Sequence, residues 1–219
     1  LIGGMILGAL PFTFHYSMIK PRLTLNVTRE VTVFMIIVVF SIIAIPFIIG
    51  IDYLTGIFYA VSAITTAGLQ VGSIAEFNEG TKIFLMLLMF IGGCGFSTAG
   101  GVKIFRFINL VSLFKKISNI ETRRKMTKKD AKELTSIVII LSLFPLISYC
   151  TALHIMGQGF TFTDAYFESV AALTTGGLSV GVTSIGLDLV SKIMLALNMI
   201  LGRFEIIAII YIIVPRLMP

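Results

Sequence analysis

Charged side chains are scarce in this sequence. Asp, Glu, Lys and Arg make up 13% of the 219 residues, hydrophobic residues make up 57%, and the mean hydropathy is +1.01. Because a soluble domain carries about 25% charged residues, a water-soluble protein is excluded. The apolar residues are gathered in blocks at 31–51, 83–91, 136–156 and 189–215. A helix needs about 20 residues to cross a bilayer, and three of the blocks reach this length. The fourth block, which begins at Ile83, stops at a glycine cluster.

The residues that would indicate an enzyme or a disulfide framework are also missing. The two cysteines, Cys94 and Cys150, lie within apolar segments, where free cysteines usually serve as small packing residues. The two histidines, His15 and His154, have no ligand-like partners in the sequence. A membrane enzyme would need His, Asp or Glu side chains that converge at membrane depth, and no P-loop or dinucleotide-binding motif is present. We therefore expect no enzyme activity and no cofactor in this chain.

Positive charge is concentrated in one linker. Ten of the seventeen Lys and Arg residues lie there: Lys103, Arg106, Lys115, Lys116, Arg123, Arg124, Lys125, Lys128, Lys129 and Lys132. Segments 50–81 and 157–190 contain no Lys or Arg. Because cytoplasmic loops of membrane proteins are enriched in these residues, linker 103–132 is predicted to be cytoplasmic, together with a smaller basic set at Lys20, Arg22 and Arg29. The two segments without basic residues are predicted to face the outside of a cell membrane that the chain crosses several times.

The basic linker has an alternative interpretation as a nucleic-acid-binding patch. No interleaved aromatic residues and no recognised binding module accompany it, so we expect no nucleic-acid partner. The linker can instead contact anionic lipid headgroups or a cytoplasmic protein, and membrane lipid is therefore an expected partner.

The first residues of the chain are predicted to continue a helix that begins upstream. Residues 1–14 are apolar and rich in glycine, too few to cross a bilayer alone, and the sequence has no initiator methionine. We therefore expect the chain to be a fragment of a longer protein.

One short apolar segment is predicted to enter the membrane and return on the same side. Block 31–51 ends outside and the block from Ile83 begins outside, so residues 52–81 must leave and return there. Within them, residues 54–69 (LTGIFYAVSAITTAGL) are apolar but too few to span the bilayer. This pattern is typical of a re-entrant helix followed by a loop.

The same pattern recurs 109 residues later. Residues 65–72 read TTAGLQVG and residues 174–181 read TTGGLSVG, with six of eight positions identical. Downstream, after one inserted residue, residues 91–93 (IGG) align with residues 201–203 (LGR). Since each unit crosses the membrane an even number of times, the two copies are parallel, unlike the inverted repeats of many secondary transporters.

Each repeated loop follows a short helix, predicted at 54–66 and 163–175, whose C-terminal end points into the bilayer. That end carries partial negative charge from unpaired carbonyls, which suits a cation. Gly68 and Gly177 permit backbone angles that other residues avoid, so that successive carbonyl oxygens can face one axis and replace the water shell of an ion. A generic glycine turn at the membrane surface is the alternative, but it does not explain two matching copies.

Neither loop contains a carboxylate. A lining of carbonyls without an acidic ring favours a monovalent cation, and K⁺ over Ca²⁺. Thr66 and Thr175 can add hydroxyl oxygens or hold the loop from behind. The metal ion expected here is K⁺, bound by backbone carbonyls as the transported ion.

The motifs TTAGLQVG, TTGGLSVG, GGCGFSTAGGVKIFR (92–106) and LGRFEI (201–206) together resemble the TrkH/KtrB/HKT superfamily of potassium transporters. The resemblance covers essentially the whole chain. It implies an all-α membrane protein in which four M1–pore loop–M2 units, related to potassium-channel subunits, surround one pore, and this chain looks like units three and four. The implied division is 1–29 (end of a preceding M2 helix and a cytoplasmic loop), 30–114 (first unit, with a broken M2), 115–135 (basic cytoplasmic linker) and 136–219 (second unit).

The resemblance also assigns roles to residues that match the family motifs. The selectivity filter for K⁺ would consist of Thr65, Thr66, Ala67, Gly68, Leu69, Thr174, Thr175, Gly176, Gly177 and Leu178. The gate would be an intramembrane loop that interrupts the first M2 helix beneath the filter, together with an arginine of the second M2 helix: Gly92, Gly93, Gly95, Ser97, Thr98, Gly100, Gly101 and Arg203.

Physical reasoning supports a broken helix at loop 92–101. Each glycine costs a helix about 1 kcal/mol relative to alanine, and broken backbone at membrane depth is tolerated only where it lines a cavity or is buried in protein. A flexible kink that lets helices pack closely is the alternative. We expect the Arg203 side chain to donate hydrogen bonds to carbonyls of this loop. The alternative is that the side chain extends to the membrane–water interface. Glu168, on the second short helix, either braces the filter from behind or is solvated.

The resemblance implies potassium uptake across the cell membrane of a prokaryote, through a glycine-lined filter gated by loop 92–101. It further implies a homodimer and a cytoplasmic RCK-type nucleotide-binding regulatory subunit. The alternatives are a Na⁺-permeable or Na⁺/K⁺-coupled cation transporter of the same fold, since two of the four expected filter loops lie outside this sequence, and a non-conducting membrane scaffold.

Overall fold

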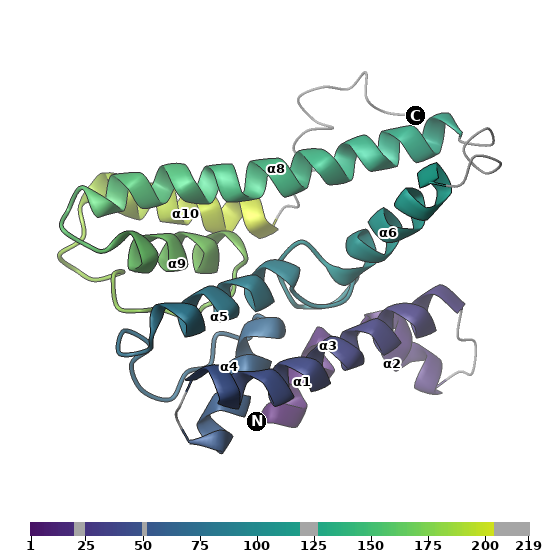
Figure 1. Cartoon of the computed structure of the whole chain (residues 1–219), viewed down its shortest axis with the longest axis horizontal. Coiled ribbons are helices and arrows are strands. Elements are labelled where there is room, and N and C mark those ends of the chain that lie inside the picture. Colours follow the sequence, from purple (N-terminus) through teal and green to yellow (C-terminus); the bar gives the residue numbers. More distant parts are fainter. Residues whose placement is uncertain (20–24, 50–51, 119–126, 204–219) are drawn as a thin grey trace.

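The computed structural model describes residues 1–19, 25–49, 52–118 and 127–203. Every regular element in these ranges is a helix (Figure 1). In chain order the helices are α1 (Ile2–Ala9), α2 (Phe12–Ile19), α3 (Leu25–Ile49), α4 (Tyr53–Ile64), α5 (Glu79–Ile91), α6 (Ile104–Ser118), α8 (Lys128–Met156), α9 (Phe162–Leu173) and α10 (Leu189–Arg203). The prediction of an all-α protein is confirmed.

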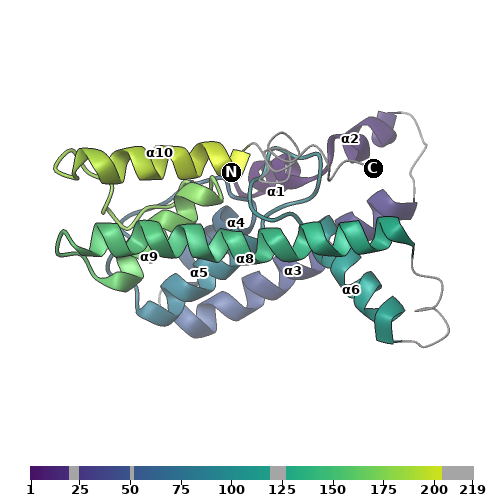
Figure 2. The same cartoon turned by 90° about the horizontal axis from the view of Figure 1, so that it is seen from above.

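The helices form two units with the same order of elements. In each unit a long helix is followed by a 12-residue helix and then by a third helix, as α3, α4 and α5 in the first unit and α8, α9 and α10 in the second. Figure 1 shows α8, α9 and α10 in the upper part of the molecule and α3, α4 and α5 below them, and Figure 2, seen from above, shows α8 in front. Helix α5 packs against α9 and joins the two units. The predicted parallel repeat is therefore present in the fold.

Two of the helices are long and apolar enough to cross a membrane. Their apolar windows are Val27–Ile45 in α3 and Asp130–Met156 in α8. The capping box that starts α8 consists of Thr127 and Asp130: the Thr127 hydroxyl accepts the Asp130 amide, and the Asp130 carboxylate accepts the Thr127 amide. We call the end of the molecule where α8 ends and α9 begins the filter side, and the opposite end, where α8 begins, the linker side.

The first residues of the chain form two helices rather than one helix end. Helices α1 and α2 are bent by 96° at Leu10 and Pro11. Proline disfavours a helical backbone in the preceding residue, and Leu10 is accordingly extended, with φ −79° and ψ 152°. The Pro11 carbonyl then accepts the Phe14 amide at 2.9 Å and starts α2. The sequence prediction of the end of an M2 helix at residues 1–20 did not anticipate this bend.

An ion pair joins the two units on the filter side. The Lys82 ammonium in the first turn of α5 lies 2.6 Å from the Asp164 carboxylate in the first turn of α9, and it also donates to the Ala75 carbonyl at 3.0 Å. Lys82 is buried, with its side chain 7% exposed. A buried lysine requires such a partner, so the contact fixes how α5 and α9 are placed relative to each other.

Several residues singled out in the sequence lie outside the described residues. They are Lys20, Arg22, Arg123, Arg124 and Lys125 of the basic sets, and residues 204–206 of the motif LGRFEI, with the remainder of the apolar block 189–215.

Candidate functional site

The two repeated loops have the same backbone conformation. Helices α4 and α9 end at Ile64 and Leu173, within two residues of the predicted ends. One residue after each helix C-cap, the backbone angle φ is 50° at both Thr66 and Thr175. Two residues later, φ is 72° at Gly68 and 71° at Gly177. A left-handed backbone is rare for threonine and costs about 1–3 kcal/mol. The same rare backbone conformation therefore recurs at equivalent positions of both loops.

The two loops meet at their glycines. A Cβ atom added to Gly68 would lie 2.9 Å from the Gly177 Cα atom and 3.0 Å from the Gly176 carbonyl oxygen. Neither position has room for a side chain, and both have backbone angles that favour glycine. The sequence-predicted filter residues Thr65–Leu69 and Thr174–Leu178 are thus brought together from opposite units.

One oxygen of this site lacks a partner. The Thr175 hydroxyl is buried and accepts or donates no hydrogen bond within the described residues. The equivalent Thr66 hydroxyl donates to the Thr65 carbonyl at 2.8 Å and accepts the Gly100 amide at 2.6 Å. A buried hydroxyl without a hydrogen bond costs free energy, and an oxygen in this state can contribute to the coordination of a cation.

The chain that follows each filter loop is held by the preceding short helix, through residues at equivalent positions. In the first unit the Tyr59 hydroxyl donates to the Val71 carbonyl at 2.6 Å and accepts the Val71 amide at 3.1 Å. In the second unit Glu168 stands 109 positions after Tyr59, and its carboxylate accepts the Val180 amide at 3.2 Å. Different side chains therefore support the same point of the two loops.

Glu168 makes further contacts behind the second loop. Its carboxylate accepts the Ser179 hydroxyl at 2.7 Å, the Thr183 amide at 3.3 Å and the Thr183 hydroxyl. Glu168 as a whole is 4% exposed. Of the two interpretations that the sequence left open for Glu168, the bracing role is the one that the structure bears out, and the solvated carboxylate is not observed.

The loop between α5 and α6 lies directly against both filter loops. It contains the predicted gate residues Gly92, Gly93, Gly95, Ser97, Thr98, Gly100 and Gly101. The Gly100 amide donates to the Thr66 hydroxyl at 2.6 Å, and the Gly101 amide donates to the Thr174 carbonyl at 3.2 Å. A Cβ atom on Gly100 would lie 1.9 Å from that carbonyl oxygen. Loop 92–101 can approach the filter this closely only because Gly100 has no side chain.

The bend between α1 and α2 holds the same loop from another side. The Cys94 amide donates to the Ala9 carbonyl at 3.1 Å, and the Thr98 hydroxyl donates to the Gly8 carbonyl at 2.8 Å. A third hydrogen bond has its acceptor in the loop: the Phe12 amide donates to the Phe96 carbonyl at 3.0 Å. Carbonyls and amides that the break at Pro11 removes from helical bonds are thus used to seat the loop.

Two charged side chains complete the contacts of loop 92–101. The Glu30 carboxylate of α3 accepts the Gly95 amide, and the Arg203 guanidinium of α10 donates to the Thr98 carbonyl at 3.0 Å. The predicted hydrogen bond from Arg203 to the loop is therefore present. Loop 92–101 therefore has hydrogen-bond partners in both repeated loops, in the α1–α2 bend, in α3 and in α10.

Sequence reasoning missed Glu30 and Tyr59. A signal for Glu30 was available, because it lies in the apolar window Val27–Ile45, and an ionisable residue within a membrane span is a candidate functional residue by default. Tyr59 gave no such signal, since an aromatic residue in an apolar helix usually serves packing. Only the offset of 109 residues from Glu168 could have indicated its role.

Two basic residues follow the loop at the start of α6. The Lys103 ammonium donates to the Ala99 carbonyl at 2.9 Å, and the Arg106 guanidinium donates to the Val102 carbonyl at 3.2 Å while lying 5.3 Å from the centre of the Phe105 ring. Both side chains therefore bind the end of the loop itself, in addition to any role as positive charges on the linker side.

Known proteins share this fold and these motifs. Residues 4–217 match the family described as "TrkH: Cation transport protein". The chain is 30% identical over 158 residues to the Trk system potassium uptake protein TrkG of Escherichia coli, a match that covers 67% of this chain and 33% of that protein. It is 28% identical over 159 residues to the Ktr system potassium uptake protein D of Bacillus subtilis, covering 69% and 34%.

A solved structure has the same fold. The potassium transporter TrkH from Vibrio parahaemolyticus matches with a TM-score of 0.77 at 20% identity, over 100% of this chain and 52% of that chain. The chain therefore spans about half of that structure and about a third of the length of the two potassium uptake proteins. The apolar helices agree with a membrane protein, and the family consists of transporters rather than enzymes. This chain belongs to the TrkH family of cation transport proteins.

Proposed function

We propose that the complete protein takes up potassium ions across the cell membrane, through a pore whose filter includes residues 65–69 and 174–178. The observation that carries the proposal is the pair of loops with matching left-handed threonines and glycines that touch each other at Gly68 and Gly177. The C-terminal ends of α4 and α9 supply partial negative charge at this point, and backbone carbonyls can replace the water shell of K⁺.

A filter of this kind needs more loops than this chain contains. We propose that two further units, from the part of the protein outside this sequence, complete a four-unit ring, and that the chain divides into units at 30–114 and 136–219 joined by the linker 115–135. The names of the relatives support potassium as the transported ion, because the TrkG and Ktr proteins are both described as potassium uptake proteins. We further propose a homodimer and an RCK-type nucleotide-binding regulator on the linker side.

The orientation follows from charge. We propose that the linker side, which holds residues 103–132, is cytoplasmic, and that the filter side opens to the outside of a prokaryotic cell. The Lys and Arg residues of the linker support this orientation by the positive-inside rule. Uptake then means that K⁺ enters at the filter and leaves past loop 92–101.

Loop 92–101 is proposed to be the gate. It lies between the filter and the linker side, and its hydrogen bonds to Thr66, Thr174, Glu30 and Arg203 would keep it seated beneath the filter. Opening would require the loop to leave this seat. Arg203 would add a positive charge beside the ion path, which raises the electrostatic barrier while the loop is closed.

Ion flux through the complete protein in liposomes tests the proposal. The expected result is a K⁺ flux that clearly exceeds the Na⁺ flux under equal gradients. A Na⁺ flux as large as the K⁺ flux would favour the Na⁺-permeable or Na⁺/K⁺-coupled alternative. The absence of flux for both ions, in protein that is folded and inserted, would contradict the proposal and favour a non-conducting scaffold.

A further inference from the structure

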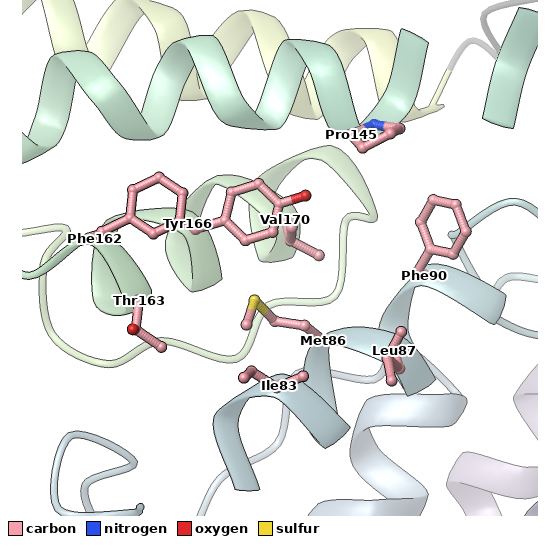
Figure 3. A pocket seen from close by; sticks show the side chains of 9 residues that line it. All are labelled: Ile83, Met86, Leu87, Phe90, Pro145, Phe162, Thr163, Tyr166 and Val170. Atoms are coloured by element: carbon pink, nitrogen blue, oxygen red, sulfur yellow. The ribbon is translucent and has the colours of Figure 1, made fainter. Parts of the chain in front are cut away.

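A pocket of about 560 Å³ lies between the two units, where α5, α8 and α9 meet. Figure 3 shows that the side chains around it face one common space. Helix α5 contributes the residues from Ile83 to Phe90 on one face, α9 contributes those from Phe162 to Val170, and α8 contributes Pro145. The volume is within the range of about 300–1,000 Å³ of pockets that hold small molecules, so the space is large enough for a ligand.

The walls of the pocket select an apolar ligand. Among the residues that line it, the hydroxyls of Thr163 and Tyr166 are the only polar side-chain groups, and no lining residue is charged. An ordered water needs two to four polar partners, and a polar ligand would leave its own groups unsatisfied. Hydrocarbon is the chemistry that fits these walls.

The place of Pro145 along α8, a helix long enough to span a membrane, indicates the depth of the pocket, and exposed apolar side chains mark its mouth. Pro145 is 11 residues before the end of α8 at Met156, which places it about 16 Å from that end at 1.5 Å per residue, close to the middle of a hydrocarbon core of about 30 Å. At the mouth, Ile83 and Leu87 are 49% and 55% exposed. Lipid is therefore the solvent at this mouth.

We propose that the acyl chain of a membrane phospholipid occupies this pocket as a bound lipid. The chain enters at the mouth beside Ile83 and Leu87 and packs against Met86, Tyr166 and Val170. Met86 and Val170 are 7% and 5% exposed, so they contact a lipid only through the pocket.

The bound acyl chain lies directly behind the second filter loop. The Val170 carbonyl accepts both the Thr174 amide and the Thr174 hydroxyl at 2.8 Å. A lipid that fills the space beside Val170 thus supports the helix end from which the filter begins. Lipid binding at this site does not depend on which ion the protein transports.

Photocrosslinking tests the proposal. The full-length protein is placed in bilayers of a phospholipid with a diazirine in the middle of one acyl chain, and the adducts are mapped by mass spectrometry. We expect adducts on Met86, Tyr166 or Val170. Leu87→Trp should reduce these adducts at least severalfold, because the larger side chain occupies the mouth through which the acyl chain enters. Leu146→Trp is the matched control, since Leu146 on α8 is also 55% exposed but does not line the pocket.

Each result decides the proposal. Adducts on exposed positions such as Leu146 alone would mean that lipid only surrounds the protein, and would overturn it. Equal loss of pocket adducts in both tryptophan variants would also overturn it. Benzoylphenylalanine at position 87 tests for another occupant of the mouth: a covalent dimer would assign the pocket to a second copy of the protein and overturn the proposal. Failure of the ion-flux proposal would leave these adducts unchanged.

Discussion

Replacing Gly100 by alanine adds one methyl group where loop 92–101 touches the filter. Gly100 does not have a positive φ, so alanine can adopt its backbone and the effect is purely steric. The new Cβ atom would lie 1.9 Å from the Thr174 carbonyl oxygen and 2.4 Å from the Thr175 hydroxyl. Ordinary contact begins at 3.4 Å, so the loop must withdraw by about 1.5 Å, well beyond the tolerance of close packing.

The magnitude follows from the strain that the methyl group adds to the seated loop. Withdrawal separates the Gly100 amide from the Thr66 hydroxyl and the Gly101 amide from the Thr174 carbonyl in the wild type and the variant alike, so these two bonds do not change the difference between them. The overpacking of the seated loop costs about 1–3 kcal/mol in the variant alone. This cost lowers the ratio of seated to withdrawn loop by roughly fivefold to 150-fold.

The assay is the K⁺ flux of the full-length protein in liposomes under conditions where the wild type is mostly closed. If the seated loop is the closed gate, Gly100→Ala raises the flux by about fivefold or more, up to the limit set by the filter, at an unchanged ratio of K⁺ to Na⁺ permeability. Gly80→Ala in α5 is the control, because its nearest contact would be 3.7 Å away. An unchanged or lower flux in correctly inserted Gly100→Ala protein would refute the gating role of this contact.

The remaining predictions concern the side chains that hold the gate and the filter. Glu30→Leu removes the acceptor of the Gly95 amide and should raise K⁺ flux by about tenfold, because a charge-assisted hydrogen bond that holds the loop is lost. Glu30→Gln keeps an acceptor and should stay near the wild-type rate. Equal rates in the two variants would contradict this prediction. Arg203→Ala should raise flux in the same assay with little loss of expression, and a wild-type rate would make Arg203 an interfacial side chain. Glu168→Ala leaves buried donors of residues 179–183 without an acceptor and should lower the free energy of unfolding by about 1–3 kcal/mol, seen as a lower Tm in detergent; an unaltered Tm would show that Glu168 does not brace the loop.

The repeated unit could be predicted from the sequence because two independent signals agree. A bilayer fixes the length of a spanning helix, so the apolar segment 54–69 was too short to span, and the matching motifs TTAGLQVG and TTGGLSVG indicated a second copy 109 residues later. The observed helices α4 (Tyr53–Ile64) and α9 (Phe162–Leu173) begin and end within two residues of the helices predicted at 54–66 and 163–175. The break after Ile91 was predicted for the same kind of reason, since glycine clusters end helices.

The contacts that hold the loops could not be predicted, because they depend on how distant segments pack. Glu30 and Gly95 are 65 residues apart, and Lys82 and Asp164 are 82 residues apart. No periodicity in the sequence relates such pairs. Glu168 shows the limit clearly: an acid in the middle of a short apolar helix suits both a solvated carboxylate and a buried brace, and only the position of residues 179–183 decides between them.

The position of Gly68 gives the most direct test of the central claim, that ions pass the loops 65–69 and 174–178. With φ 72° and 2.9 Å between an added Cβ atom and Gly177, a side chain at Gly68 must shift the filter backbone. The decisive measurement is the ratio of K⁺ to Na⁺ permeability of the full-length protein in liposomes, wild type against Gly68→Ser. The account predicts that the ratio falls by at least severalfold while K⁺ still passes, because the carbonyl positions change. A permeability ratio identical to that of the wild type, with normal flux, would contradict it.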